Sequence, residues 1–319
     1  MWDPDLKEYF TLKTGANDTR WWNGETIWET AAKEGIKSGV CFWPGSEVPG
    51  KTPTYYLHYD QSLPYFDRVA HVVSWLSKPK KDRPRFLALY MEGVDTAGHN
   101  YGPDSPEVDA AIEEADLALG ALIANVTKLE RTVGPATIIV LSDHGMAAID
   151  PQARGIFLEE DCGLTLSDNE VVETGPVLMI NPADVDAAVA ALNNCSAHLS
   201  AYTPENLPAR MHYVGNRRIS KVVGVVDQGW MAFRNKAEAQ SWSPGGAHGY
   251  DPEAEDMHGF LVATGNGVHS DGRVIPRVPN VDIYEFVAKL LGIKSPASTN
   301  TTNALVTYAL AEDKETVEE

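Results

Sequence analysis

Residues 86–91 read Phe-Leu-Ala-Leu-Tyr-Met, and residues 137–141 read Thr-Ile-Ile-Val-Leu. Both are continuous apolar runs of strand length, which is typical of strands buried in a parallel sheet. Between them lies a long helical pattern. Ser105 can cap it, Pro106 occupies its first position, and apolar residues recur every three or four positions as far as Leu129. A strand, a helix and a second buried strand in this order predict an α/β fold with a mostly parallel central sheet flanked by helices.

The same alternation extends in both directions from this stretch. Helices are expected from about Ile27 and after Pro64, a strand at 40–43, and near the end a strand at 260–264 and a helix at 281–291. Residues from about 150 to 245 are less regular. We expect them to form a smaller inserted α+β segment, with a helix at 184–193 and strands near 222–223 and 231–233.

The composition describes a globular chain with an acidic surface. Its 319 residues include 26 basic and 45 acidic side chains, which gives a formal net charge of −19. That balance argues against a nucleic-acid duplex or an anionic membrane as a partner, because phosphate backbones are bound by clustered Lys and Arg. We find no stretch long enough to span a membrane and no signal peptide, and we expect residues 311–319 to be an acidic tail.

Three cysteines leave two interpretations open. Cys41, Cys162 and Cys195 match no zinc module, so they are either buried thiols or one bridge plus one cysteine left over. N-glycosylation sequons at Asn17, Asn125, Asn194 and Asn300 favour a glycoprotein of the secretory pathway. We therefore expect the full-length protein to be extracellular, secreted or membrane-anchored.

Chemically capable side chains follow the predicted strands. Asp95 and His99 come after the first apolar run, Asp143 and His144 directly after the second, and His248 lies in a glycine-rich loop. Ligands of open parallel sheets bind beyond the carboxyl ends of the strands. Asp oxygen and His nitrogen together suit Zn²⁺ or a similar divalent ion.

Each of these pieces has an ordinary explanation when it is taken alone. Asp95 can cap a helix beside a surface His99, an Asp-His pair after a strand is common, and an isolated His248 is usually just a loop residue. All three pieces lie in glycine-rich loops after apolar strands, and this combination favours a metal site. We expect these side chains to converge in space.

Five sequence blocks, in order, resemble the nucleotide pyrophosphatase/phosphodiesterase family of the alkaline phosphatase superfamily. They are residues 21–28, 42–47, 95–105, 142–146 and 248–260, which include Trp-Trp-Asn-Gly-Glu-Thr-Ile-Trp and Ser-Asp-His-Gly-Met. The resemblance implies an alkaline phosphatase-like core and one type I phosphodiesterase domain over residues 1–310. It also implies hydrolysis of phosphodiester or pyrophosphate bonds in extracellular nucleotides, with release of a nucleoside monophosphate.

The resemblance implies a site with two Zn²⁺ ions. Asp95, His99 and His248 would hold one ion, and Asp143 and His144 would help to hold the second. The family's Thr nucleophile, with the strand and Asp ligand before it, has no counterpart in this chain, and we expect it upstream of Met1. Without that threonine we expect the chain by itself to be inactive, because removal of a covalent nucleophile costs many powers of ten in rate.

By the same resemblance, Trp43, Pro44 and Tyr59 would line a nucleotide base pocket. The alternative is that Trp43 and Tyr59 are core aromatics. Asn23 stands where some nucleotide-hydrolysing members have a Lys, and relatives that cleave choline phospholipids share the zinc residues. The expected partner is a small nucleotide or phosphodiester substrate, and a choline phospholipid is the alternative substrate. A third hypothesis is a metal-binding chain without catalytic activity.

Overall fold

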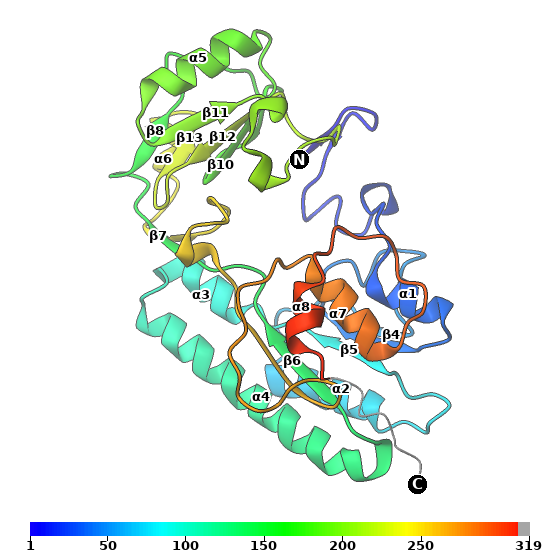
Figure 1. Ribbon diagram of the computed structural model, residues 1–319. Coiled ribbons are helices and arrows are strands. Elements are labelled where there is room, and N and C mark those ends of the chain that lie inside the picture. The colour runs from blue at the N-terminus through cyan, green and yellow to red at the C-terminus, as the bar shows by residue number, and fades with distance from the viewer. Residues whose placement is uncertain (312–319) are drawn as a thin grey trace. The chain divides into compact units, whose positions relative to one another are not determined.

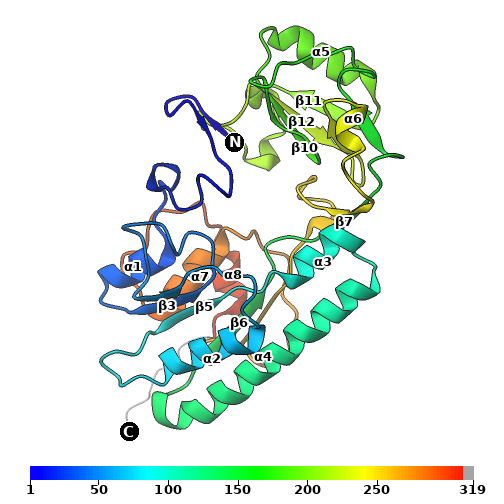
Figure 2. The same cartoon turned by 180° about the vertical axis from the view of Figure 1, so that it is seen from behind.

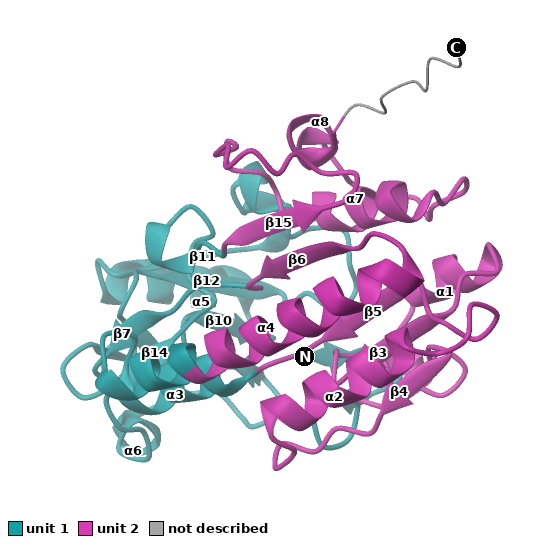
Figure 3. Cartoon of the chain, turned by 90° about the horizontal axis from the view of Figure 1, so that it is seen from below, with its two compact units in different colours: residues 1–15, 92–113, 144–259 teal, residues 16–91, 114–143, 260–319 magenta. Residues whose placement is uncertain are grey.

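The computed structural model describes residues 1–311 and separates them into two compact units (Figures 1 and 3). Unit 1 contains residues 1–15, 92–113 and 144–259, and unit 2 contains residues 16–91, 114–143 and the chain from residue 260 onward. The predicted acidic tail, apart from Ala311, lies outside the described residues. Each unit is assembled from three separate stretches of the chain, so neither unit corresponds to one continuous segment.

Unit 2 contains the two strands that were predicted from the apolar runs at 86–91 and 137–141. β3 (Ser38–Cys41) lies between β4 (Tyr55–Leu57) and β5 (Phe86–Leu89), and all three run parallel. β6 (Thr137–Leu141) pairs antiparallel with β15 (Leu261–Gly265). Every residue of β3 is buried, whereas every residue of β5 and β6 is only partly buried. Within the described residues β5 pairs only with β3, and β6 only with β15.

Helices cover both faces of these strands. They are α1 (Ile27–Lys33), α2 (Tyr65–Leu76), the larger part of α4 (Pro106–Val133), α7 (Asp282–Leu291) and α8 (Ala304–Ala309), with a 3-10 turn at Thr19–Trp21. In β5, Leu87 packs in a cluster with Trp75 of α2 and Leu122 of α4, whereas Phe86 packs in the cluster of α1 and α7. Alternate residues of one strand thus face helices on opposite sides, which is the three-layer arrangement of an α/β fold.

Unit 1 holds one four-stranded sheet and three two-stranded sheets, and several of their strands are labelled in Figure 2. Its strands are β1 (Trp2–Asp3), β2 (Glu8–Tyr9), β7 (Ala147–Ile149), β8 (Gly155–Phe157), β9 (Val171–Glu173), β10 (Val177–Ile180), β11 (Leu199–Tyr202), β12 (Val222–Val226), β13 (Met231–Phe233) and β14 (Gly245–Ala247). β11, β12, β10 and β9 form one antiparallel sheet, and the remaining strands pair as β1-β2, β13-β8 and β14-β7.

The helices of unit 1 are short apart from α5. They are α3 (Gly93–Tyr101), the start of α4, α5 (Val185–Cys195), α6 (Lys236–Ala239) and 3-10 turns at Pro204–Asn206, Ala209–Met211 and Glu255–Met257. Asp184 caps α5 by accepting from the backbone of Ala187, and Leu192 buries its side chain in the cluster beneath the helix. The predicted helix at 184–193 and the strands near 222 and 231 are therefore present.

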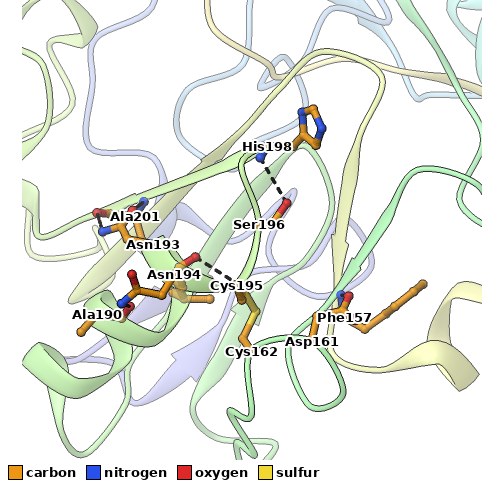
Figure 4. The surroundings of a disulfide bond; sticks show 11 residues. Phe157, Asp161, Cys162, Ala190, Asn193, Asn194, Cys195, Ser196, His198 and Ala201 are labelled. Atoms are coloured by element: carbon orange, nitrogen blue, oxygen red, sulfur yellow. Dashed lines mark hydrogen bonds between the residues drawn. A yellow bond between two sulfur atoms is a disulfide. The ribbon is translucent and has the colours of Figure 1, made fainter.

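A disulfide resolves the choice that the sequence left open. Cys162 and Cys195 are bridged with their Cα atoms 4.7 Å apart, at the end of α5 (Figure 4). Cys41 is buried in unit 2 and stands outside the bridge. Asn194, the sequon residue beside Cys195, is exposed. One bridge with one cysteine left over is thus the correct reading.

Predicted and observed elements differ mainly at strand ends. The strand expected at 40–43 occupies Ser38–Cys41, because Phe42 has a positive φ of 66° and leaves the extended conformation. The run at 86–91 ends as a strand at Leu89. The predicted cap at Ser105 is confirmed, because its side chain accepts from the backbone of Val108 at the start of α4. At α1, Thr26 and Glu29 form a reciprocal capping box that was not predicted from the sequence.

Candidate metal centre

Helix α3 presents an aspartate and a histidine on one face. Asp95 and His99 are four residues apart, one helical turn, so their side chains lie one above the other. The Nε2 atom of His99 lies 3.4 Å from Oδ1 of Asp95. The chain thus brings one carboxylate and one imidazole together by local helix geometry alone.

Two further imidazoles reach the same oxygen through a strand pair. His144 precedes β7 and His248 follows β14, and these strands pair antiparallel with Ala147 opposite Ala247. Antiparallel pairing brings the start of one strand beside the end of the other, so residues 104 positions apart in the sequence become neighbours. Their rings stack with centroids 3.5 Å apart, and their Nε2 atoms lie 4.0 Å (His144) and 3.6 Å (His248) from Asp95 Oδ1.

Backbone carbonyls fix the orientation of two rings. Nδ1 of His99 lies 2.9 Å from the carbonyl oxygen of Gly246, and Nδ1 of His144 lies 2.9 Å from that of Gly145. A carbonyl only accepts, so Nδ1 must carry the proton and donate it in each case. In the neutral ring, Nε2 then presents its lone pair, which is the form that binds a metal.

At the centre of the cluster, the described residues supply no hydrogen-bond donor to the carboxylate oxygen. Oδ1 of Asp95 is buried and has no hydrogen-bond partner within the described residues. The Nε2 lone pairs of His99 and His144 therefore face a carboxylate oxygen, an arrangement that repels unless a cation lies between them. The side chains of this cluster fit zinc as ligands, because zinc binds imidazole nitrogen and carboxylate oxygen. Asp95, His144 and His248 offer ligand atoms within 4.8 Å of one another, and residues 1–311 contain no second such group of three.

Two glycines allow the strand to approach the helix. A Cβ added at Gly245 would lie 2.2 Å from the carbonyl oxygen of His99, and one at Gly246 would lie 2.5 Å from that of Gly98. Neither distance is compatible with any side chain larger than hydrogen. The close approach of β14 to α3 is what brings the Gly246 carbonyl within reach of His99 Nδ1.

The other predicted site residues belong to unit 2. Asp143, the residue before His144, is the last residue of segment 114–143 of unit 2. Its role as a metal ligand stays a prediction. Trp43 and Tyr59 are 37% and 50% exposed, so neither is a core aromatic, and Pro44 begins the turn at Gly45. The ring of Tyr59 meets Phe42 edge-on with centroids 5.4 Å apart, and its backbone N–H donates to Glu47.

The model of the "Type I phosphodiesterase / nucleotide pyrophosphatase" family matches residues 1–251, which include every one of these side chains. The chain belongs to this family. Venom phosphodiesterase 2 of Crotalus adamanteus is 35% identical over 97% of this chain and 39% of its own length. The bis(5'-adenosyl)-triphosphatase of Xenopus laevis is 34% identical over 94% of this chain and 65% of its own length.

A solved structure of a murine ectonucleotide pyrophosphatase/phosphodiesterase 5 variant superimposes with a TM-score of 0.87. The two chains are 31% identical, and the match covers 98% of this chain and 82% of the murine one, which is an inactive threonine-to-alanine variant in complex with AMP. The predicted alkaline phosphatase-like α/β fold is thereby confirmed. The chain spans about two fifths of the length of the venom phosphodiesterases that it matches. None of its described helices is long and apolar enough to cross a membrane.

The sequence did not reveal the backbone part of this centre. The carbonyl oxygens of Gly145 and Gly246 orient the imidazoles, yet a carbonyl is present at every residue and gives no sequence signal. The glycines themselves were the available clue, because a glycine beside a ligand often marks a close approach of the backbone.

Proposed function

We propose that this chain supplies the metal-binding core of a zinc-dependent phosphodiesterase that hydrolyses extracellular nucleotides and releases a nucleoside monophosphate. One observation carries the proposal: three imidazole Nε2 atoms lie 3.4 to 4.0 Å from a buried carboxylate oxygen that accepts no hydrogen bond from the described part of the chain. The names of the relatives support the choice of substrate, and the words "venom" and "ectonucleotide" in them support an extracellular location.

In this proposal Asp95, His99 and His248 hold one Zn²⁺, and Asp143 and His144 help to hold a second. Bound zinc supplies positive charge that stabilises the attacking and leaving oxygens of phosphoryl transfer. The chain's own residues prepare the site. Asp95 provides the negative charge, and the hydrogen bonds at Nδ1 hold the rings of His99 and His144 with their lone pairs toward it.

The nucleophile is proposed to be a threonine on a further strand, outside these 319 residues. The inactive threonine-to-alanine variant of the murine relative is consistent with a threonine in that role. The strands of unit 2 give independent support. β5 and β6 are apolar and partly exposed, and within residues 1–311 each pairs on one side only, so each offers backbone groups to another strand.

The exposed aromatics of unit 2 are proposed to bind the nucleotide base. Tyr59 and Trp43 are partly exposed to solvent, and stacking on an aromatic ring contributes about 1–3 kcal/mol per base. Measured in a protein that also contains the upstream threonine, Tyr59→Ala should raise KM for a nucleotide substrate about tenfold. Tyr59→Phe should keep most of the affinity. Tyr308→Ala is the matched control, because Tyr308 is also an exposed tyrosine of unit 2.

Calorimetric titration of the metal-free 319-residue chain with Zn²⁺ tests the site directly. One tightly bound ion per chain is expected, because the second ion would lack the aspartate ligand that is expected upstream. The chain alone should not turn over substrate. A protein extended upstream should hydrolyse a chromogenic ester of thymidine monophosphate, and a chelator should abolish the activity. Preference for a chromogenic choline-phosphate ester would instead establish the phospholipid alternative. Absence of zinc binding would remove the whole proposal, and turnover by the 319-residue chain alone would show that its nucleophile lies within this sequence.

A further inference from the structure

The loop that carries His248 is held firmly on its incoming side. β14 pairs with β7, and Gly246 accepts the hydrogen bond from His99. Directly after His248 the chain turns sharply, because Gly249 has a positive φ of 106°. The direction of the His248 ring therefore depends also on what holds the outgoing side, residues 249–254.

Two side chains tie down that outgoing side. Tyr250 is buried, and its hydroxyl donates to the carbonyl oxygen of Trp230 at 2.9 Å. The Asp251 carboxylate accepts from both terminal nitrogens of Arg210, at 2.6 and 2.5 Å, one to each oxygen. One of those oxygens also accepts from the backbone N–H of Glu253 at 3.0 Å, which closes a local turn.

Arg210 reaches the loop from a distant part of the chain. It lies in the 3-10 turn Ala209–Met211, which begins after Pro208 and ends at His212 in the left-handed conformation with φ 49°. It lies 41 positions before Asp251 in the sequence. The ion pair therefore connects the irregular middle segment, which donates no metal ligand to the cluster, to the loop that does.

The geometry of this pair matters more than its energy. Both side chains are partly exposed, 39% for Arg210 and 32% for Asp251, so solvent screens their attraction and the contribution to global stability is small. Two parallel hydrogen bonds nevertheless fix the carboxylate in orientation as well as in distance. The Arg210 guanidinium also lowers the pKa of Asp251, so the carboxylate stays charged at neutral pH.

We propose that Arg210 and Asp251 are positioning residues for the metal centre, acting as a clamp that keeps His248 Nε2 directed at Asp95 in the metal-free protein. The inference rests on the proposed zinc site. A loop held in the binding geometry loses little freedom when the metal arrives, so the clamp raises zinc affinity without touching the ion. Partners in the shell beyond the ligands typically change metal affinity 10- to 100-fold.

The test compares Zn²⁺ affinity in the full chain with three clamp variants. Arg210→Gln and Asp251→Asn should each weaken binding about tenfold, and Arg210→Lys should restore part of the loss because it keeps the charge without the two-pronged geometry. The double variant should bind zinc no more weakly than Arg210→Gln alone, since that variant already removes the pair with Asp251 as well as the longer contact of Arg210 with Glu253 at 3.8 Å. Asp251→Asn keeps an oxygen for the Glu253 N–H, so the local turn is preserved.

Arg234→Gln is the matched control. Arg234 pairs with Asp168 in the same unit, and this pair includes no residue of the His248 loop, so its loss should leave zinc affinity unchanged. Co²⁺ provides a spectroscopic signature: its visible absorption should change in the clamp variants and not in the control, while all variants melt within a few degrees of one another. Equal zinc affinity and an unaltered Co²⁺ spectrum in Arg210→Gln would overturn the clamp.

The clamp and the proposed function fail in different ways. If the unaltered chain binds no Zn²⁺, the proposed function is wrong, and the clamp is then judged by amide hydrogen exchange of residues 248–254. Exchange there should be faster in Arg210→Gln than in Arg234→Gln. Equal exchange in the two variants would show that Arg210 does not hold this loop.

Discussion

Gly246→Ala should damage the metal centre through one added methyl group. The new Cβ would lie 2.5 Å from the Gly98 carbonyl oxygen and 2.8 Å from Met146 Cγ, whereas ordinary contact begins at 3.4 Å. Strand β14 must then move away from α3 by about 0.9 Å, the difference between 3.4 and 2.5 Å. Overpacking of this kind costs about 1–3 kcal/mol. The Gly246 carbonyl would move with the strand and release His99 Nδ1.

The expected consequence is a loss of both stability and zinc affinity. Urea unfolding should show a loss of about 2 kcal/mol for unit 1, and calorimetry should show zinc binding weakened about 10- to 100-fold, the usual effect of removing the partner of a ligand histidine. Gly120→Ala is the control, because a Cβ at Gly120 in α4 meets nothing within 4 Å and alanine favours a helix. A Gly246→Ala protein with unchanged zinc affinity and urea midpoint would refute the reasoning.

Three further predictions concern separate features. Asp95→Asn should abolish measurable Zn²⁺ binding in calorimetry while leaving the circular dichroism spectrum unchanged, since it removes the charge that three imidazoles face. Replacing Cys162 and Cys195 together with Ser should destabilise unit 1 by about 4 kcal/mol in urea, because the bridge closes a loop of 33 residues. Burial alone would raise the pKa of Asp282, but hydrogen bonds from Thr302 and its neighbours lower it, so its stabilising effect is complete above about pH 5 and is lost as the pH falls below about 4. When the urea midpoint of unfolding is measured at a series of pH values, it should fall less steeply below about pH 4 in Asp282→Asn than in the unaltered chain.

The sequence predicted the local elements well because their signals are local. The run at 137–141 and the helix that begins at Pro106 were recognisable from apolar spacing and caps, and the structure places them as expected. The strand at Ser38–Cys41 was misplaced by two residues, since only the left-handed backbone of Phe42 determines where it stops. No side-chain pattern reports a single φ angle of a bulky residue.

The sequence by itself determined which residue types were available for chemistry: Asp95 and His99 one helical turn apart, and histidines after apolar strands. Only the tertiary structure decided that His144 and His248 stack over the same carboxylate oxygen, because strand pairing between residues about a hundred positions apart is a long-range contact that spacing does not encode. It also decided the tautomers, through backbone carbonyls, and the anchoring of Asp251 by Arg210. Ligand identity is thus a property of the sequence here, whereas ligand geometry comes from packing.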